Sequence, residues 1–474
     1  MKRDGMKRKN IIYIMGIVLA VVLIGLFSLK SDTEPVNGMI IFTQVFPGTT
    51  DYDADKARIV AITPENDKPE ILSEGFYAAR SPVLSSDARY ILFAGKKTMD
   101  EPWQIWKMNI SSNETEKVFK CKVDCTDPAF LPDGQILYSK MVNVTEDAKG
   151  FALFTCNSDG EEHKQITFHP HDDLLSTIMQ DGRILFISKQ QHPSASTPQL
   201  MAMRPNGSKI RLFYLNQNNS WPISRGKETK DGKMVFIESS NANEPGGSLV
   251  SISLTRPLHS HELLNNDARY HSVYPLKSGK MIVSCKENNA KTFELWEFDP
   301  ESKKREKLIF SDPDYWSVEP IAVYARQRPK KLPDELNYKD MTGRVLCLDA
   351  NNSNMPSLNR AEEASKGTAI QVMGIDGIWG EVPLEEDGSF LLRVTANKAL
   401  QFRTVNEAGE VVRGPSAWIW LSPHERRGCV GCHEDPEMTP KNVEPMAVKN
   451  LPVEVMAPDT QEMEKMNKKS EKKG

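Results

Sequence analysis

Short apolar segments that follow a tight polar turn recur along the first two thirds of the chain. In Asp133-Gly134-Gln135-Ile136-Leu137-Tyr138, an Asp-Gly turn and one polar residue precede three apolar residues. Asp-Gly and Asn-Gly favour tight hairpins because both residues tolerate positive φ. Six such turns, at residues 37–38, 87–88, 133–134, 181–182, 231–232 and 278–279, lie 46 to 50 residues apart. The pattern therefore predicts one β unit that is repeated six times.

Each repeat continues with a second β segment in which apolar and polar residues alternate, as at 104–108 and 294–298. Four strands in about 40–50 residues is the length of a propeller blade. We therefore expect an all-β protein in which residues 31–326 form a six-bladed β-propeller, with residues 318–325 closing the ring beside the first blade. A seven-bladed ring is the alternative. The repeat resembles the TolB-type propeller unit, best seen at Leu131-Pro132-Asp133-Gly134.

A second β region follows a segment that is rich in proline and charge. Residues 327–340 have no apolar periodicity and are expected to be a linker. Residues 341–447 contain further apolar runs separated by turns, and Trp418-Ile419-Trp420 is expected to be the last strand. This pattern predicts a small antiparallel β-sandwich. Residues 448–474 are polar and end in a lysine-rich stretch, which favours a disordered tail.

The N-terminal segment has the pattern of a membrane anchor. Five basic residues within the first nine precede residues 11–29, which carry no charge. A helix of that length spans roughly 28 Å, close to the ~30 Å hydrocarbon core of a bilayer. We expect an uncleaved single-pass helix in the inner membrane, with the bulk of the chain in the periplasm. The alternative is that residues 1–30 are a cleaved signal peptide and the protein is exported to the periplasm.

Composition narrows the range of functions. The 474 residues carry a formal net charge of −4 and have room for two or three domains, without a basic face interleaved with aromatic residues. Nucleic acid is therefore not an expected partner. Seven cysteines are few for a disulfide scaffold. Cys121 and Cys125 are spaced to close a small disulfide loop; the alternative is that all cysteines outside residues 429–433 are free thiols.

The most specific motif is Cys429-Val430-Gly431-Cys432-His433, a single C-x-x-C-H. This spacing is the attachment signal of a c-type haem. The thiols of Cys429 and Cys432 reach the two vinyl groups of one porphyrin edge, and His433 then offers an imidazole nitrogen to the iron. Gly431 adds no side chain where the backbone passes close to the ring. The motif predicts one covalent haem c with His433 as an axial ligand.

Two further sets of metal ligands are candidates. The sixth iron ligand could be Met438 or Met446, whose thioether would raise the reduction potential, or His424, which precedes the motif. The alternatives are packing or exposure for the methionines, and for His424 a capping role, a hydrogen bond to a haem propionate or exposure to solvent. A second metal site could form at His169 and His171 beside two carboxylates. The alternative there is an ordinary polar loop that enters a blade.

The region from Gly380 to Glu434 resembles the middle domain of the hydrazine synthase alpha subunit. It combines Pro-Leu-Glu-Glu-Asp-Gly-Ser-Phe, Trp-Ile-Trp and Glu-Arg-Arg-Gly with the Cys-Val-Gly-Cys-His-Glu that follows. The resemblance extends in kind over residues 38–447 and implies a haem in this domain. In that family a tyrosine four residues after the motif's histidine binds the iron, and a C-terminal domain carries a second haem. Glu437 stands at the tyrosine's position and the sequence has one C-x-x-C-H, so we do not expect hydrazine synthesis.

Three functions follow from these features. The first is a membrane-anchored periplasmic monohaem cytochrome that transfers electrons, with the propeller as the docking platform for a redox protein partner. The second is a haem enzyme, similar to hydrazine synthase, that acts on a small nitrogen or oxygen species; the sequence does not define that small-molecule substrate. The third is a propeller that binds a glycan or a peptide, with the haem in an auxiliary role.

Overall fold

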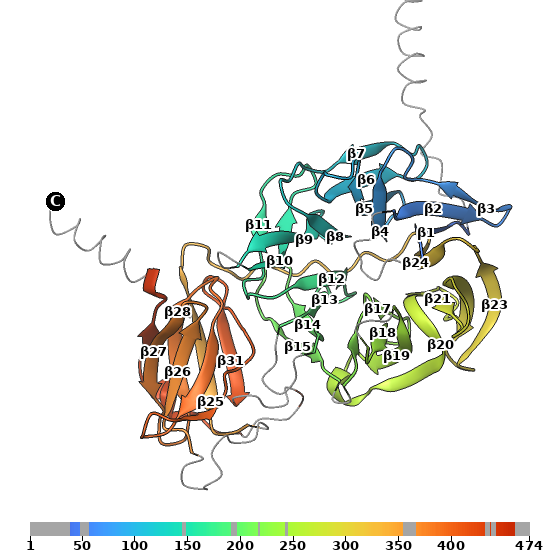
Figure 1. The fold of residues 1–474 in the computed structure, drawn as a ribbon. Helices are drawn as coiled ribbons and strands as arrows, with labels where there is room; N and C mark the ends of the chain where they lie inside the picture. Colours follow the sequence, from blue (N-terminus) through green and yellow to red (C-terminus); the bar gives the residue numbers. More distant parts are fainter. Residues whose placement is uncertain are drawn as a thin grey trace, which may run out of the picture.

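The computed structural model of the chain describes residues 38–47, 56–144, 148–190, 197–216, 219–241, 245–353, 366–431, 437 and 442–459. Over these ranges the ordered elements are β-strands and two short 3-10 helices, η1 (Pro257–His259) and η3 (Met446–Lys449). The predicted all-β class is therefore confirmed. Figure 1 shows a ring of small sheets with a separate sandwich beside it.

The membrane anchor predicted at residues 11–29 lies outside the described residues. Among the residues that are described, no helix is long and apolar enough to cross a membrane. The helices η1 and η3 have three and four residues, whereas a membrane span needs about 20. The predicted location as a single-pass inner-membrane protein is therefore corrected, because the described structure contains no such span.

The ring consists of six four-stranded blades. Blade 1 contains β24 (Trp316–Ala322), β1 (Ile40–Val45), β2 (Arg58–Thr63) and β3 (Asn66–Ile71), and blade 2 contains β4 (Ala78–Leu84), β5 (Tyr90–Lys96), β6 (Gln104–Asn109) and β7 (Thr115–Lys117). Blade 3 contains β8 (Cys125–Phe130), β9 (Ile136–Asn143), β10 (Lys149–Cys156) and β11 (Lys164–Gln165), and blade 4 contains β12 (Asp173–Ile178), β13 (Ile184–Ser188), β14 (Gln199–Met203) and β15 (Arg211–Tyr214).

Blades 5 and 6 share one continuous sheet. Its strands are β16 (Trp221–Pro222), β17 (Lys227–Glu228), β18 (Lys233–Ser239), β19 (Gly247–Ser253), β20 (Glu262–Pro275), β21 (Met281–Lys286), β22 (Glu294–Asp299) and β23 (Lys304–Phe310). The first part of β20 pairs with β19 and the second part with β21, so one strand is the outer edge of blade 5 and the inner edge of blade 6.

The two ends of the propeller sequence close the ring. β1 pairs with β24, from Ile40 opposite Ala322 to Val45 opposite Trp316. The six-bladed prediction and its closure by residues 318–325 are confirmed, and the seven-bladed alternative is wrong. Strands β13 and β14 are buried at every position because each blade is covered by neighbours on both faces.

A β-bulge recurs in the innermost strands and directs polar side chains toward the axis. Ser81, Asp127, Leu175 and Glu319 have φ between 51° and 56°. The strand ladders shift register next to each of them. A non-glycine residue adopts this conformation only where the surrounding structure holds it.

Two carboxylates at these bulges tie the blades together. Glu319 of blade 1 accepts a hydrogen bond of 2.9 Å from the backbone N–H of Ser81 in blade 2. Asp127 of blade 3 pairs with Arg225 of blade 5 at 2.7 Å. Arg225 also donates to the carbonyl oxygen of Ser176 in blade 4. The axis is therefore closed by polar contacts between blades.

The segment between β24 and β25 has no regular structure and lies against the propeller. Its backbone N–H groups at Arg326 and Lys330 donate to the carbonyl oxygens of Ser86 and Gln180, at 2.7 and 3.0 Å. Both acceptors lie in turns that follow innermost strands. The linker thus crosses the face of the propeller on which these turns lie (Figure 1).

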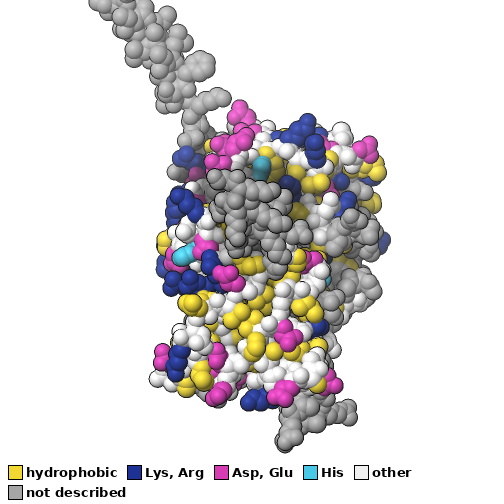
Figure 2. Space-filling model, turned by 90° about the vertical axis from the view of Figure 1, so that its left-hand side faces the viewer, with side chains coloured by type: hydrophobic (Ala, Val, Ile, Leu, Met, Phe, Trp, Pro, Cys, Tyr) yellow, Lys and Arg dark blue, Asp and Glu magenta, His cyan; other side chains and the backbone are white. Residues whose placement is uncertain are grey.

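The second domain is a sandwich of two four-stranded sheets. One sheet has the order β31 (Arg426–Gly431), β25 (Thr342–Asp349), β28 (Phe390–Thr395), β32 (Val453–Val455). The other has the order β27 (Gly377–Pro383), β26 (Ala369–Gly374), β29 (Gln401–Val405), β30 (Val411–Arg413). Buried side chains from both sheets, among them Val345, Ile370 and Leu392, form its core. Figure 2 shows apolar side chains among charged ones on the outer surface at this side of the molecule.

Three details of the predicted sandwich are wrong. The sheet is not wholly antiparallel, because β31 and β32 pair parallel with β25 and β28. Both strands arrive through long connections, which permit parallel pairing where a hairpin does not. Trp418-Ile419-Trp420 is not a strand; Ile419 makes one isolated bridge to Leu400. Residues 453–455, predicted to belong to a disordered tail, form β32 and bury Val455 in the core.

Candidate functional site

The first cysteine of the C-x-x-C-H motif lies on an edge strand of the sandwich. Cys429 is half-buried on β31, directly opposite Cys347 of β25 in parallel register. Because paired residues of parallel strands point to the same face, the two cysteines are side by side. Cys429 packs against the core of the sandwich. Cys432 and His433 lie outside the described residues.

Two glycines of this strand have opposite surroundings. A Cβ atom at Gly431 would collide with the carbonyl oxygen of Asn352. A Cβ atom at Gly428 would have no heavy atom within 4 Å among those considered. The close approach of the Asn352 backbone thus leaves no room for a side chain at position 431. Gly428 marks open space on the face of β31 opposite to the side chain of Cys429.

Met446 lies at the end of the sheet where the motif begins. Its backbone N–H donates to Asp387 Oδ2 at 2.7 Å. Asp387 precedes β28, whose first residue, Phe390, pairs with Cys347. We call this the motif end of the sheet. Of the predicted sixth ligands, Met446 is therefore placed near the motif, and Met438 lies outside the described residues.

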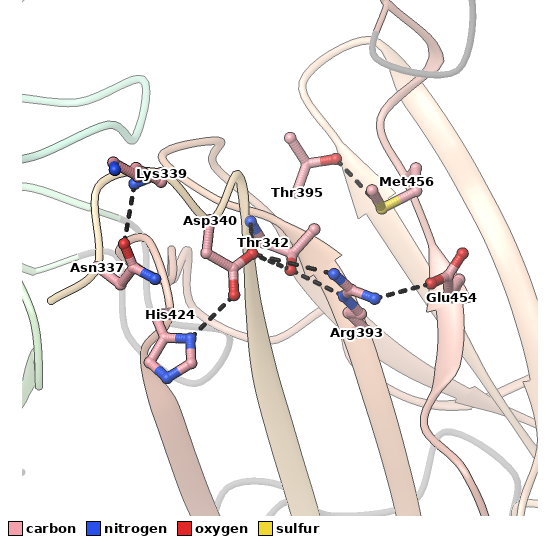
Figure 3. A network of polar contacts seen from close by, with 9 residues as sticks. All are labelled: Asn337, Lys339, Asp340, Thr342, Arg393, Thr395, His424, Glu454 and Met456. Atoms are coloured by element: carbon pink, nitrogen blue, oxygen red, sulfur yellow. Dashed lines mark hydrogen bonds and ion pairs between the residues drawn. The ribbon is translucent and has the colours of Figure 1, made fainter. Parts of the chain in front are cut away.

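His424 lies at the opposite end of the same sheet, where Thr342 pairs with Thr395. Figure 3 shows its ring directed at Asp340, with Nδ1 and Oδ2 2.9 Å apart. Although burial opposes ionisation, hydrogen bonds from Thr342 and His424 hold the pKa of Asp340 below its usual value.

The length of the sheet separates these residues from the motif. Met456 also lies at the opposite end, where Thr395 Oγ1 donates to its sulfur at 3.8 Å (Figure 3). An extended strand rises ~3.3 Å per residue, so the level of Thr342 is ~17 Å from that of Cys347. A ligand must bond the iron directly. The position of His424 therefore does not favour it as the sixth ligand.

His169 and His171 do not form a ligand pair around a common point. His169 is buried; its Nε2 lies 2.8 Å from Asp173 Oδ1 and its Nδ1 accepts from the backbone N–H of His171. Both ring nitrogens of His169 are thus engaged. Burial, with a contribution from His169, lowers the pKa of His171. Across the described ranges, no group of three or more His, Cys, Asp or Glu side chains converges as a metal site.

Instead, His169 supports the contact between the two domains. The ring of Trp420, from the sandwich, stacks on His169 with 5.9 Å between centroids. Trp420 is fully buried, and its Nε1 donates to the carbonyl oxygen of Gly207 at 3.0 Å. Trp420 is thus part of a propeller core cluster that contains Phe186 and Met203. The sequence placed Trp420 in a strand of the sandwich and gave no sign of this role.

A buried glutamate joins the propeller to the start of the motif strand. Glu425 Oε1 accepts from the backbone N–H of Lys209 at 3.0 Å and from Arg427 Nη2 at 2.9 Å. Its Oε2 accepts from the backbone N–H of Ser422 at 2.8 Å. Lys209 Nζ in turn donates to the carbonyl oxygen of Arg426 at 2.7 Å. These bonds fix β31 against the loop between β14 and β15 of blade 4.

A second glutamate joins the propeller to the segment after the motif. Glu437 Oε1 accepts from the backbone N–H of Leu258 at 2.7 Å. Its Oε2 lies 3.6 Å from Arg256 Nε. Both partners belong to the η1 region of blade 5. The carboxylate of Glu437, four residues after the motif's histidine in sequence, is therefore directed at the propeller.

A separate cavity opens on the other face of the propeller. It has a volume of about 520 Å³ and is lined by residues that begin the innermost strands, among them Arg80, Asp127 and Val318. The linker and the motif strand contact turns on the opposite face. This cavity is where a glycan or peptide ligand of the propeller would bind, and that function stays a prediction.

Cys121 and Cys125 do not form the disulfide that their spacing suggested. Both are free thiols, as are the buried Cys156 and Cys285. Burial, with a contribution from a hydrogen bond to Cys121, raises the pKa of Cys125.

These observations define a class of protein: a six-bladed propeller that holds a sandwich domain and its C-x-x-C-H strand. Residues 342–434 match the family described as the hydrazine synthase alpha subunit middle domain. The hydrazine synthase subunit alpha of Kuenenia stuttgartiensis is 21% identical over 514 residues, which cover 81% of this chain and 63% of that protein. This chain thus spans less than two thirds of the length of that relative.

A solved structure of similar fold accompanies this match, and a second one is reported for comparison. The structure of Kuenenia stuttgartiensis hydrazine synthase has a TM-score of 0.77 at 19% identity, covering 88% of this chain and 72% of that one. TolB from Acinetobacter baumannii has a TM-score of 0.47 at 15% identity, covering 62% and 67%. Residues 342–434 thus match the middle-domain family, and the fold of the chain is similar to that of hydrazine synthase.

Proposed function

We propose that this protein binds one covalent haem c at Cys429 and Cys432, with His433 as an axial ligand, and catalyses a redox reaction on a small nitrogen compound. The proposal rests on the likeness to the hydrazine synthase alpha subunit. The observation that carries it is the attachment of the motif segment to the propeller on both sides, through Glu425 before it and Glu437 after it. A group bound between these two points lies beside the domain interface rather than on a free tail.

The residue types of the motif fit a covalent haem. Two thiols and an imidazole are the donor set that this group requires. Cys429 is only half-buried and lies on an edge strand of the sandwich. When bound, haem supplies an iron that exchanges electrons and binds small ligands.

The protein's own side chains then have distinct roles. Cys429 and Cys432 hold the porphyrin, and His433 orients it. Glu425 positions β31 on blade 4. Glu437, which stands where the resemblance implies a tyrosine ligand, binds Leu258 and Arg256 of the propeller instead. We do not extend the proposal to hydrazine synthesis for that reason.

Electron transfer to a redox protein partner is the second candidate. The position of Met446 at the motif end of the sheet favours it. A thioether in the sixth position would close the iron to small ligands and raise its reduction potential. An open sixth position would favour the enzyme.

The test uses the full chain produced in a host with a c-type haem maturation system. Haem staining on a denaturing gel should be positive for the wild type and for Cys285→Ser, a buried cysteine of blade 6. The double variant Cys429→Ser/Cys432→Ser should not stain. Titration with nitric oxide or hydroxylamine should then shift the Soret band. A wild type that does not stain would contradict the proposed covalent haem. A stained protein whose spectrum does not change with either ligand would favour electron transfer.

A further inference from the structure

Arg211 is an exposed arginine at the edge of blade 4, where it begins β15. Within the part of the chain that the structure describes, its guanidinium makes no hydrogen bond or ion pair. Partial burial and the nearby Arg183 lower the pKa of Arg211, while Asp181 and Glu437 oppose that effect. The site around Arg211 thus favours an additional negative charge.

Arg256 lies on the neighbouring blade, on the other side of Glu437. Its side chain is 68% exposed, and its Nε lies 3.6 Å from Glu437 Oε2. Helix η1, which follows Arg256, contacts β15. Two arginines from adjacent blades therefore flank the segment that follows the motif. The carboxylate of Glu437 lies near both of them.

The chain itself brings the motif within reach of both arginines. Glu437 is four residues after His433, so their Cα atoms are at most ~14 Å apart. Before the motif, Lys209 Nζ binds the carbonyl oxygen of Arg426 at 2.7 Å. Lys209 and Arg211 are separated by one residue. The edge of blade 4 thus lies close to both ends of the motif segment.

We propose that Arg211, assisted by Arg256, binds the propionate carboxylates of a haem attached at Cys429 and Cys432; this rests on the proposed function. The two propionates leave the porphyrin on the edge opposite the thioethers, so they extend away from β31. The planar guanidinium binds a carboxylate through two parallel hydrogen bonds. The haem would then be covalently fixed to the sandwich and ionically fixed to the propeller.

This arrangement has a consequence for stability. A group that bridges two domains in the folded state, and cannot do so in the unfolded chain, stabilises the folded state. The stabilisation requires both attachments. Removing the arginines should therefore affect the protein with haem more than the protein without haem, in which only the 3.6 Å contact of Arg256 with Glu437 is lost.

The experiment compares Arg211→Met, Arg256→Met and the double variant with the wild type, each as full-length protein with covalent haem. Lys307→Met, which removes an exposed charge from β23 of blade 6, is the matched control. We expect the arginine variants to lower the midpoint reduction potential, because a positive charge near the porphyrin favours the added electron. Lys307→Met should leave the potential unchanged, and Arg211→Lys should restore part of the shift.

Thermal unfolding supplies the second readout. The arginine variants should lower the transition temperature of the haem-bearing protein. In the Cys429→Ser/Cys432→Ser background, Arg211→Met should have no such effect and Arg256→Met a smaller one, because only its contact with Glu437 is lost. The inference would be overturned if the arginine variants changed neither the reduction potential nor the transition temperature. It would also be overturned if they destabilised the protein equally with and without haem and left the reduction potential unchanged. A wild type without covalent haem would overturn the proposed function and the inference with it. If the wild type bears haem and the arginine variants have the same potential and transition temperature as the wild type, only the inference is overturned.

Discussion

The indole Nε1 of Trp420 donates a hydrogen bond of 3.0 Å to the carbonyl oxygen of Gly207, across 213 residues of sequence. Trp420 comes from the sandwich, and Gly207 is in the turn between β14 and β15 of blade 4. Gly207 has φ +86°, and a Cβ there would approach the backbone of Ile166. A tryptophan of one domain is thus bound by a turn that only glycine forms without strain, and this contact sets the sandwich on the propeller.

Replacing Trp420 should destabilise the contact between the domains. Trp420→Phe removes the hydrogen bond and should cost about 1 kcal/mol, whereas Trp420→Ala should cost about 3–5 kcal/mol because it leaves a cavity. Chemical denaturation monitored by circular dichroism measures both. Trp418→Ala, at a half-buried neighbour, is the control and should cost clearly less. A Trp420→Ala protein as stable as the wild type would contradict the role assigned to this residue.

Two glycines of the motif strand should respond differently to the same substitution. Gly431→Ala places a methyl group against the carbonyl oxygen of Asn352, so β31 must shift where the second cysteine follows. We expect a loss of stability of about 1–3 kcal/mol and reduced covalent haem. Gly428→Ala meets nothing within 4 Å and should be tolerated. Thermal unfolding and the haem-to-protein absorbance ratio measure the pair; equal effects of both changes would contradict the structure of this strand.

Met446 and Met456 provide a test of the sixth ligand. Met446 is at the motif end of the sheet, and Met456 is at the opposite end, bonded to Thr395. If Met446 ligates the iron, Met446→Ala should abolish the methionine-to-iron charge-transfer band of the oxidised protein and lower its reduction potential. Met456→Ala should change neither. An effect of Met456→Ala with none of Met446→Ala would contradict the ends assigned to the two residues.

Stability should depend on pH through Lys227, beside the propeller axis. Burial, with Arg225 and Arg326 nearby, lowers the pKa of Lys227 from 10.5 to about 7. Between these two values the unfolded chain binds one more proton than the folded protein, so the free energy of unfolding rises with pH there. Lys227→Met removes this contribution, up to ~1.4 kcal/mol per pH unit. Urea denaturation of both proteins at pH 7, 8 and 9 measures it, and parallel pH dependences would contradict the burial of the charge.

The repeat in the sequence by itself determined the propeller. Turns of Asp-Gly type at a spacing of 46 to 50 residues, each followed by apolar residues, are a local signal, and they were sufficient for six blades and for the closure at residues 318–325. The C-x-x-C-H spacing is equally local, and it alone determined Cys429, Cys432 and His433 as candidates. The motifs around it also determined the likeness to the hydrazine synthase alpha subunit.

Only the tertiary structure decided which distant residues meet. The positions of Trp420 on Gly207, Glu425 on Lys209 and Glu437 on Leu258 depend on how two domains pack, and no periodicity in the chain encodes such pairs. The same holds for the parallel strand β31, since strand direction is set by long connections rather than by local turns. The sequence had left Met446 and His424 as equal candidates for the sixth iron ligand. The sheet places them at opposite ends, because an extended strand rises ~3.3 Å per residue.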